Sequence, residues 1–368
     1  MMSTTTASVP TTRASGTRPS AWNRDILQLA RLLRTYLATM AAPQRSVWWG
    51  AGYSELMLHA LPALPALNAP EQTVVADSDA RLTRRACNWA GANAQERHLL
   101  ALGDLRLDRA GLEAQLKRHA AHDAAGYLAL QDSLAQHSQR TPCQADGSAD
   151  LLVADFVLNR IPVDEWQPAL AEAMRVLQRE GRFFCALLVS DEALPQASSV
   201  RAAPSGRPLQ LPHEKVVLQA LQDAGFHGLV QHWPDNRHPA ALDRIGDAEV
   251  RMLLVQASKG KQGPCLELGQ AVVYRGPWRQ VSDDDGHVYP RGERVAVCAK
   301  TYDLLMRKPY SGAFMGLRRA HEPELQDAAL FDCNTPALRD PRVTKGLQPF
   351  AGAAPAGAGA CAPDSGCC

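Results

Sequence analysis

Two apolar stretches on either side of a helix pattern decide the fold: residues 151–157 read LLVADFV and residues 183–189 read FFCALLV. Each has the length of a strand and is almost continuously apolar, as in strands that are covered on both faces. Between them, Asp164 can cap a helix and Gly181 can end it. The apolar residues of that helix fall on one face, namely Trp166, Leu170, Met174 and Leu177. Strand, helix and strand in this order predict a unit of a parallel sheet.

The same alternation continues in both directions along the chain. Toward the N-terminus the pattern predicts helices over 25–40 and 80–90. It predicts short buried strands over 73–76 and 99–102, and another that leads up to 48–52. Toward the C-terminus it predicts a helix from about residue 212 and two strands without a helix between them, 228–233 and 250–257. We therefore expect a doubly wound α/β sheet of the Rossmann-like type with an antiparallel edge strand, followed by a small C-terminal α+β domain.

Composition shifts suggest where the domains begin and end. Residues 1–24 are rich in Ser, Thr and Arg and predict a disordered tail, with an organellar transit peptide as the alternative. Residues 25–258 form the predicted first domain, with a polar insertion at about 109–148. After a Gly-rich linker at 259–264, we expect a small domain over 265–333 and an extended Cys-rich tail over 334–368.

The charge balance points to a small-molecule partner. The chain has 39 basic and 38 acidic residues in 368, so no basic excess predicts nucleic acid or an anionic membrane as a partner. It also lacks the run of about 18 apolar residues that a membrane-spanning helix needs. Nine cysteines without a secretory signal favour reduced thiols, and we expect a cytoplasmic protein.

A Gly-rich turn and two acids follow successive predicted strands. Gly50 and Gly52 could let the backbone approach a ligand, and Asp77 could accept both hydroxyls of a ribose. Asp104, at the expected end of the next strand, could meet an adenine amino group. Together they predict an adenosine site at the carboxyl edge of the sheet. The alternatives are that Asp77 caps a helix and that Asp104 belongs to a turn.

The segment after this site resembles class I methyltransferases. Residues 146–159, and then 172–183 with Arg175-Val176-Leu177 and Gly181-Arg182, are similar to the acidic strand and the E-x-x-R-V-L-K-P-G-G-R motif of that family. The resemblance implies S-adenosylmethionine as cofactor and adds Asp155 to the candidate cofactor-binding residues. In the Gly-rich motif, Trp48 stands where the family has an acid and Ser54 where it has a third glycine.

The second half of the chain is similar to the C-terminal domain of bacterial arsenite methyltransferases. The matching segments are 269–276, 284–287, 291–292, 297–298, 331–333, 341–346 and the Cys-terminated tail. The resemblance implies methyl transfer to trivalent arsenic, a soft ion held by cysteine thiolates, with a thiol reductant as a further partner and detoxification as the biological setting. The chain reads Asp155-Phe156-Val157 where that family has Asn-Cys-Val.

The cysteines divide by their predicted surroundings. Cys87 and Cys185 fall within a helix and a strand and are expected to be core residues, whereas Cys143 lies in the insertion. Cys265 and five others lie outside such patterns, and the candidate arsenic ligands are Cys298, Cys333, Cys361, Cys367 and Cys368. The last three, on a Gly/Ala tether, could capture a soft ion or could simply oxidise in a disordered tail.

Three functions follow, and no catalytic residue can be assigned. The first is an S-adenosylmethionine-dependent methyltransferase acting on thiol-bound trivalent arsenic. The second is a catalytically degenerate paralogue that binds metalloid through cysteines or partners an active enzyme, which Trp48 and Phe156 favour. The third is a methyltransferase that acts on a different small molecule.

Overall fold

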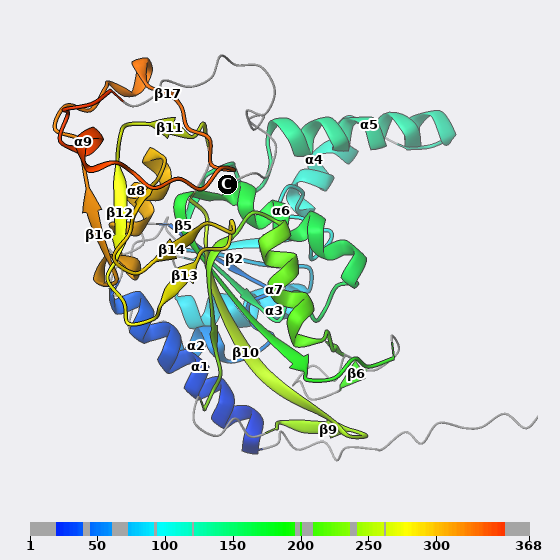
Figure 1. Cartoon of the computed structure of the whole chain (residues 1–368). Helices are drawn as coiled ribbons and strands as arrows, with labels where there is room; N and C mark the ends of the chain where they lie inside the picture. The colour runs from blue at the N-terminus through cyan, green and yellow to red at the C-terminus, as the bar shows by residue number, and fades with distance from the viewer. Residues whose placement is uncertain are drawn as a thin grey trace, which may run out of the picture.

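A computed structural model describes nine ranges of the chain: 20–39, 45–60, 73–91, 94–119, 121–195, 199–200, 209–235, 241–260 and 263–349. Figure 1 shows a central sheet with helices on both faces and the C-terminal elements gathered beside it. In this part of the chain no helix is both long enough and apolar enough to cross a membrane.

The central sheet has the strand order β3-β2-β1-β4-β5-β10-β8, and β9 pairs with β10. The strands span Gln95–His98 (β3), Thr73–Asp77 (β2), Ser46–Trp49 (β1), Ala149–Asp155 (β4), Leu177–Ser190 (β5), Ala248–Ser258 (β10), His227–His232 (β8) and Asp243–Ile245 (β9). From β3 to β5 every pairing is parallel, and β10 is antiparallel to both β5 and β8. The antiparallel strand is confirmed, but its predicted position at the edge is wrong, because β8 pairs with its outer side and β10 lies between β5 and β8.

This arrangement is the class I methyltransferase fold that the sequence predicted. Its strands are buried on both sides because two hydrophobic cores flank the sheet. The period of two sends Trp48 into one core and Trp49 into the other. Both residues are fully buried, which explains why these strands are continuously apolar.

The helices divide between the two faces of the sheet. Helices α1 (Ser20–Thr39), α2 (Leu56–Ala60) and α3 (Ala80–Ala90) supply the core that contains Trp48. The core that contains Trp49 is covered by helices α6 (Trp166–Val176) and α7 (Glu214–Asp223). The short turn η3 (Val163–Glu165) precedes α6. The predicted helix at 25–40 begins earlier, at Ser20, because Trp22 extends its buried stripe. The part of the predicted tail at 1–19 lies outside the described residues.

The predicted insertion contains two helices, α4 (Arg109–Arg118) and α5 (Ala124–Arg140). Their side chains are mostly exposed, and the pair projects away from the sheet in Figure 1. Asp108 and Asp123 accept hydrogen bonds from Gly111 and Gly126 as N-caps. Only Gln115 of α4 and Leu130 of α5 are buried.

The prediction of a strand at 99–102 is wrong. The third strand is β3, made of Gln95, Glu96, Arg97 and His98, all half-buried. An edge strand is covered on fewer sides than a central one, so it carries polar residues that an apolar pattern does not detect. A short two-stranded pair, β6 (Ser199–Val200) with β7 (Leu209–Gln210), lies outside the central sheet.

The C-terminal part has its own small core and three sheets. Its strands are β11 (Leu266–Glu267), β12 (Ala271–Tyr274), β13 (Gln280–Ser282), β14 (Val288–Pro290), β15 (Arg294–Ala296), β16 (Phe314–Leu317) and β17 (Ala329–Leu330), with the helices α8 (Ala299–Leu305) and α9 (Pro341–Thr344) and the short turns η4 (Tyr310–Gly312) and η5 (Leu325–Asp327).

The predicted extended tail is wrong over residues 334–349, which are part of this C-terminal structure. Arg339 donates from one guanidinium nitrogen to both carboxylate oxygens of Glu267, each at 2.8 Å, and both side chains are about nine-tenths buried. Val343 of α9 is also buried. A buried ion pair and an apolar anchor hold the segment although its sequence shows no periodicity.

Candidate functional site

Asp77 ends β2 at the carboxyl edge of the sheet, where the sequence placed it. Its carboxylate is fully buried and accepts hydrogen bonds from both terminal nitrogens of Arg160, at 2.7 Å and 2.9 Å. The backbone N–H of Asp79 donates to the same carboxylate at 2.8 Å. Both carboxylate oxygens of Asp77 accept from Arg160, so the residue is part of a closed ion pair in this structure.

Arg160 was not among the sequence candidates. It lies in the loop after β4, and one of its terminal nitrogens also donates to the Gly50 carbonyl at 3.4 Å. Its guanidinium lies over the Tyr53 ring, 4.9 Å from the ring centre. No local pattern distinguishes an arginine that folds back onto a distant strand, so only the tertiary structure reveals this contact.

Gly50 and Gly52 adopt positive φ angles of 74° and 90°, as a tight turn after β1 requires. A Cβ atom on Gly52 would lie 2.1 Å from the carbonyl oxygen of Leu82, and one on Gly50 would lie 2.6 Å from the Val157 side chain. The space beside each glycine is therefore filled by the chain itself. The close packing of this turn explains both glycines without a ligand.

Asp155 lies at the end of β4 and is fully buried. Ser54 donates to it twice, from its hydroxyl at 2.6 Å and from its backbone N–H at 3.1 Å. The Ser54 hydroxyl also accepts from the N–H of Leu56 at the start of α2. Burial raises the pKa of the Asp155 carboxyl to about 6, although the hydrogen bonds from Ser54 and the nearby Arg160 oppose the rise.

This raised pKa predicts a pH dependence of stability. The folded protein holds the Asp155 proton up to about pH 6, whereas an unperturbed carboxyl loses it near 3.8. The folded state is thus favoured below the lower value and loses up to about 3 kcal/mol as the pH rises through the higher one. Asp155→Asn should remove that loss. The check is urea unfolding of both proteins from pH 4 to pH 8.

The difference in unfolding free energy between wild type and Asp155→Asn at each pH reports the titration of Asp155, because the other titratable groups are the same in both proteins. Asp164→Asn, at an exposed position, is the control and should follow the wild-type curve. Parallel curves for wild type and Asp155→Asn would contradict the prediction.

Asp104 lies outside the strands, unlike Asp77 in β2 and Asp155 in β4. It lies in a turn six residues beyond the end of β3 and accepts a hydrogen bond from the N–H of Arg106 at 2.7 Å. Asp104 is thus a turn residue, as the alternative interpretation had it, because β3 ends at His98, and its contact with an adenine stays a prediction.

Aromatic side chains fill the space above the glycine turn. Phe156 is fully buried, with Trp22 of α1 at 5.2 Å and Tyr53 at 5.8 Å between ring centres. Phe156 has a positive φ of 56°, which a non-glycine residue adopts only where its surroundings enforce it. Phe156 stands where a cysteine was expected from the resemblance, and it serves as a packing residue.

The class I fold implies S-adenosylmethionine as cofactor, and the side chains at this sheet edge do not fit it as they are arranged. Arg160 takes both carboxylate oxygens of Asp77, Ser54 takes those of Asp155, and the chain itself crowds Gly50 and Gly52. A nucleoside needs Asp77 and the turn to be accessible.

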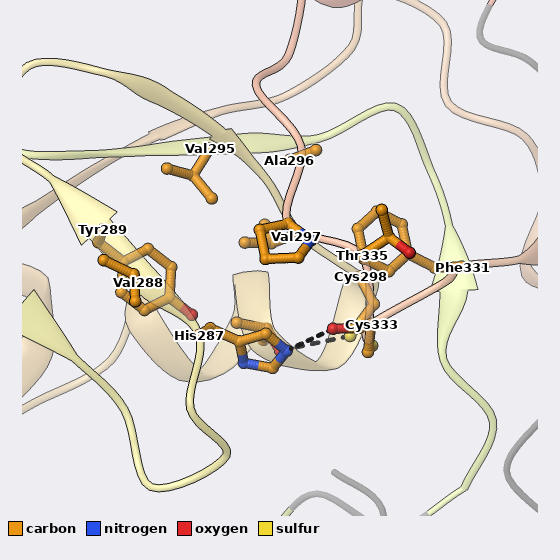
Figure 2. Close-up of a pocket in the computed structure, with 12 residues that line it drawn as sticks. His287, Val288, Tyr289, Val295, Ala296, Val297, Cys298, Phe331, Cys333 and Thr335 are labelled. Atoms are coloured by element: carbon orange, nitrogen blue, oxygen red, sulfur yellow. Dashed lines mark hydrogen bonds between the residues drawn. The ribbon is translucent and has the colours of Figure 1, made fainter.

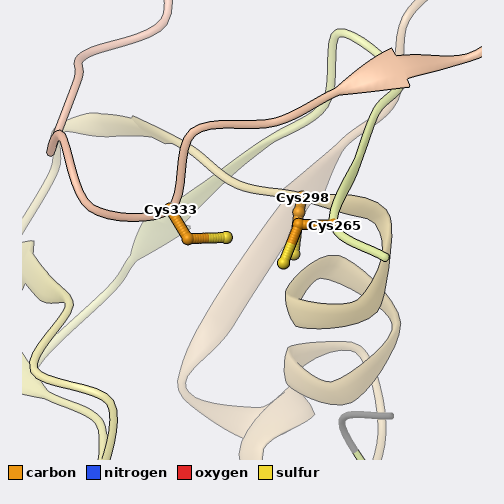
Figure 3. Close-up of side chains that lie close together, drawn as sticks. All are labelled: Cys265, Cys298 and Cys333. Carbon is orange, nitrogen blue, oxygen red and sulfur yellow. The ribbon is translucent and has the colours of Figure 1, made fainter. Parts of the chain in front are cut away.

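A second candidate site consists of three thiols in the C-terminal part. The Sγ atoms of Cys265, Cys298 and Cys333 all lie within 4.8 Å of one another, and Figure 3 shows the side chain of Cys333 pointing toward the other two. Cys298 is buried, and the other two are half-buried. None of the six cysteines in the described ranges forms a disulfide. The cluster can therefore offer three sulfur ligands to one ion.

Strand pairing brings these thiols together. Antiparallel β11 and β17 place Cys265 beside Phe331, whose N–H donates to the Cys265 carbonyl at 2.8 Å, and Cys333 follows two residues later. Cys298 is the N-cap residue of α8, and its sulfur lies 3.3 Å from the Thr301 hydroxyl. Three short segments, far apart in sequence, converge on one point.

A cavity adjoins the thiols, and Figure 2 shows His287, Cys298 and Cys333 along its wall. The Nε2 atom of His287 lies 3.2 Å from the Cys333 carbonyl oxygen, and its Nδ1 atom lies 2.9 Å from Asp283. The rest of the wall is mainly apolar, including Val295, Val297 and Phe331. Cys298 and Cys333 are thus reachable from a small, largely apolar cavity.

The other described cysteines lie within or against the two large cores and are less reactive than ordinary thiols. Burial raises the pKa of Cys87 to about 11 and those of Cys143 and Cys185 to about 12, so these thiols keep their protons at neutral pH. Cys185 is a core residue, as the sequence predicted, and Cys87 packs against the core that contains Trp48.

Of the predicted arsenic ligands, the structure brings Cys298 and Cys333 together, and Cys361, Cys367 and Cys368 lie outside the described residues. Cys265 completes the cluster and was not predicted as a ligand. The two-residue strands β11 and β17 are too short to leave a sequence pattern, so nothing local indicated that Cys265 meets Cys333.

A family model described as a domain of unknown function, DUF8838, matches residues 261–349, and no curated protein sequence matches. Similar solved structures include the arsenic(III) S-adenosylmethionine methyltransferase CrArsM of Chlamydomonas reinhardtii, with 18% identity over 82% of this chain and 98% of that chain, at a TM-score of 0.38.

Two other similar structures are also methyltransferases. The 1,6-didemethyltoxoflavin-N1-methyltransferase of Burkholderia thailandensis, solved with S-adenosylhomocysteine, is 13% identical over 66% of this chain and 82% of its own, at a TM-score of 0.38. The N-methyltransferase NodS of Bradyrhizobium japonicum is 12% identical over 67% and 100%, at 0.36. The strand order of the central sheet is that of the class I methyltransferase fold, and a segment that matches DUF8838 follows this sheet.

Proposed function

We propose that this chain binds a soft, trivalent ion, with arsenic(III) as the first candidate, through Cys265, Cys298 and Cys333. The observation that carries the proposal is that these three sulfur atoms lie within 4.8 Å of one another. Three thiolates bonded to one ion at about 2.3 Å, the length of a zinc–thiolate bond, lie within about 4 Å of one another. Small side-chain movements would bring the sulfurs to that spacing.

The number of ligands favours a trivalent ion over zinc. Within the described residues the cluster holds three donors, and no His, Asp or Glu joins them, whereas structural zinc takes four. Arsenous acid would exchange its three hydroxyl groups for three thiolates. Each thiol gives its proton to a departing hydroxyl, so three water molecules leave and the arsenic stays trivalent. Sulfur is the ligand that soft ions prefer.

Arsenite binding to the reduced, purified chain tests the proposal. We expect one arsenic per chain after gel filtration, measured by mass spectrometry of the element, and the loss of three titratable thiols. Bound ligand should also raise the unfolding free energy, by about 2.7 kcal/mol at a free concentration of 100 times Kd. The triple variant Cys265→Ser/Cys298→Ser/Cys333→Ser should bind no arsenic.

A second triple variant distinguishes arsenic binding by the cluster from arsenic binding by the cysteines of the C-terminal tail. Replacing Cys361, Cys367 and Cys368 by serine should leave the stoichiometry at one. If the tail variant loses arsenic and the cluster variant keeps it, the proposal is wrong and the tail is the binding site.

Methyl transfer from S-adenosylmethionine to the bound arsenic is the second candidate function, and the class I sheet favours it. The chain would then be a methyltransferase with the metalloid as its small-molecule substrate and a thiol reductant as partner. Incubation with S-adenosylmethionine, arsenite and reductant, followed by mass spectrometry, tests it through the appearance of methylated arsenic. Methyl donor consumed without an arsenic product, in the presence of other acceptors, would point to a different small molecule.

A further inference from the structure

We propose that Arg160 is an internal competitor for the nucleoside position of the class I sheet, so that an adenine nucleoside reaches Asp77 only when the guanidinium withdraws. The inference rests on the second candidate function, methyl transfer from S-adenosylmethionine, only because that function determines which ligand is tested. It concerns the sheet edge and not the thiol cluster.

Arg160 occupies the groups with which a nucleoside would bond. Its two terminal nitrogens donate to the two oxygens of Asp77, as the two hydroxyls of a ribose would. One of them also donates to the Gly50 carbonyl in the turn after β1. A ligand and the guanidinium cannot use the same carboxylate oxygens at once in the same geometry.

Aromatic packing holds the guanidinium in place. Tyr53 lies under it, and Phe156 and Trp22 pack beyond Tyr53, all three almost fully buried. The Arg160 side chain itself is 8% exposed, and that of Asp77 is inaccessible. Since a desolvated, bidentate ion pair is much stronger than an exposed one, the closed arrangement should dominate in the absence of a ligand.

The backbone beside Arg160 is anchored, so the side chain must be the part that moves. The Asn159 amide nitrogen donates to the carbonyls of Leu188 and Gln210, at 2.8 Å and 2.7 Å, and its oxygen accepts from the N–H of Leu188. The α carbon of the next residue is thereby held near β5. A rotation of the Arg160 side chain is enough to release Asp77.

The test compares the binding of S-adenosylhomocysteine by wild type, Arg160→Ala and Arg160→Gln in isothermal titration calorimetry. When only a fraction of molecules is open, the apparent Kd is the intrinsic Kd divided by that fraction, so we expect the variants to bind about ten-fold tighter or more. Circular dichroism and a thermal unfolding curve establish that each variant is folded.

Two controls make the result specific. The double variant Asp77→Asn/Arg160→Ala lacks the carboxylate and should lose the gain. Arg106→Ala removes an arginine from another partly buried pair, with Glu172, and should bind like wild type.

Equal affinity of wild type and folded Arg160 variants, or no binding by any of them, would overturn the inference. If both Arg160 variants fail to fold, wild type decides: a Kd for S-adenosylhomocysteine of about 1 μM or below would show that the ion pair does not exclude the ligand. Arsenite binding by Arg160→Gln should equal that of wild type, so failure here is distinguishable from failure of the thiol site.

Discussion

Replacing Arg160 by alanine is expected to lower the free energy of unfolding by about 3–5 kcal/mol, because it leaves the Asp77 carboxylate buried without its counter-ion. Asp77 is inaccessible to solvent, and besides Arg160 it accepts a hydrogen bond from the uncharged backbone N–H of Asp79. Urea unfolding of wild type and variant, followed by far-UV circular dichroism, measures the loss.

A double-mutant cycle attributes the loss to the pair. Asp77→Asn alone leaves a buried guanidinium, and Asp77→Asn/Arg160→Ala removes both charges, so the double variant should lose less than the sum of the single variants. Arg109→Ala is the matched control, since its pair with Glu113 on α4 is exposed and should contribute about 0.5 kcal/mol or less. A loss for Arg160→Ala as small as that of the control would show that the pair does not stabilise the fold.

Cys298→Ser alone is expected to weaken arsenite binding by about 100-fold or more, which corresponds to about 3 kcal/mol. Cys298 is the buried member of the cluster, and serine would offer a hard oxygen in place of a soft thiolate. Two thiolates would remain, with one hydroxyl still on the arsenic. A competition titration against a dithiol chelator gives the two dissociation constants.

Cys87→Ser is the control for that measurement, because Cys87 lies on α3 and burial raises the pKa of its thiol to about 11. It should bind arsenite as wild type does. If Cys298→Ser binds with wild-type affinity and the titratable thiols still fall by three, the ion is bound at other cysteines.

The thiol cluster and the sheet edge depend on different properties of the chain. At the carboxyl edge of the sheet, the side chains of Arg160, Tyr53 and Phe156 pack together where we propose that a nucleoside would bind. The thiol cluster brings three sulfur atoms within 4.8 Å of one another beside a small cavity. A soft-ion site on a closed methyltransferase fold is consistent with both, and release of Arg160 would add the cofactor to it.

The sequence alone determined the central sheet. Two-sided burial leaves continuous apolar runs such as 183–189, and the alternation of these runs with helical patterns predicts the layers and the antiparallel strand. It also identified Asp77 at the end of β2, as well as Cys298 and Cys333 as candidate ligands. The predictions of the sheet and of the position of Asp77 succeed because they depend on periodicity and on residues adjacent in sequence, whereas ion binding by Cys298 and Cys333 stays a prediction.

The tertiary structure alone decided which partners those residues have. Arg160 is 83 residues from Asp77, and Cys265, Cys298 and Cys333 come from three separated segments. The polar edge strand β3 and the ordered segment at 334–349 also escaped prediction, because an edge strand lacks an apolar run and a docked segment needs no periodicity. Contacts of this kind depend on how distant segments pack together, and the sequence pattern around each residue contains no record of them.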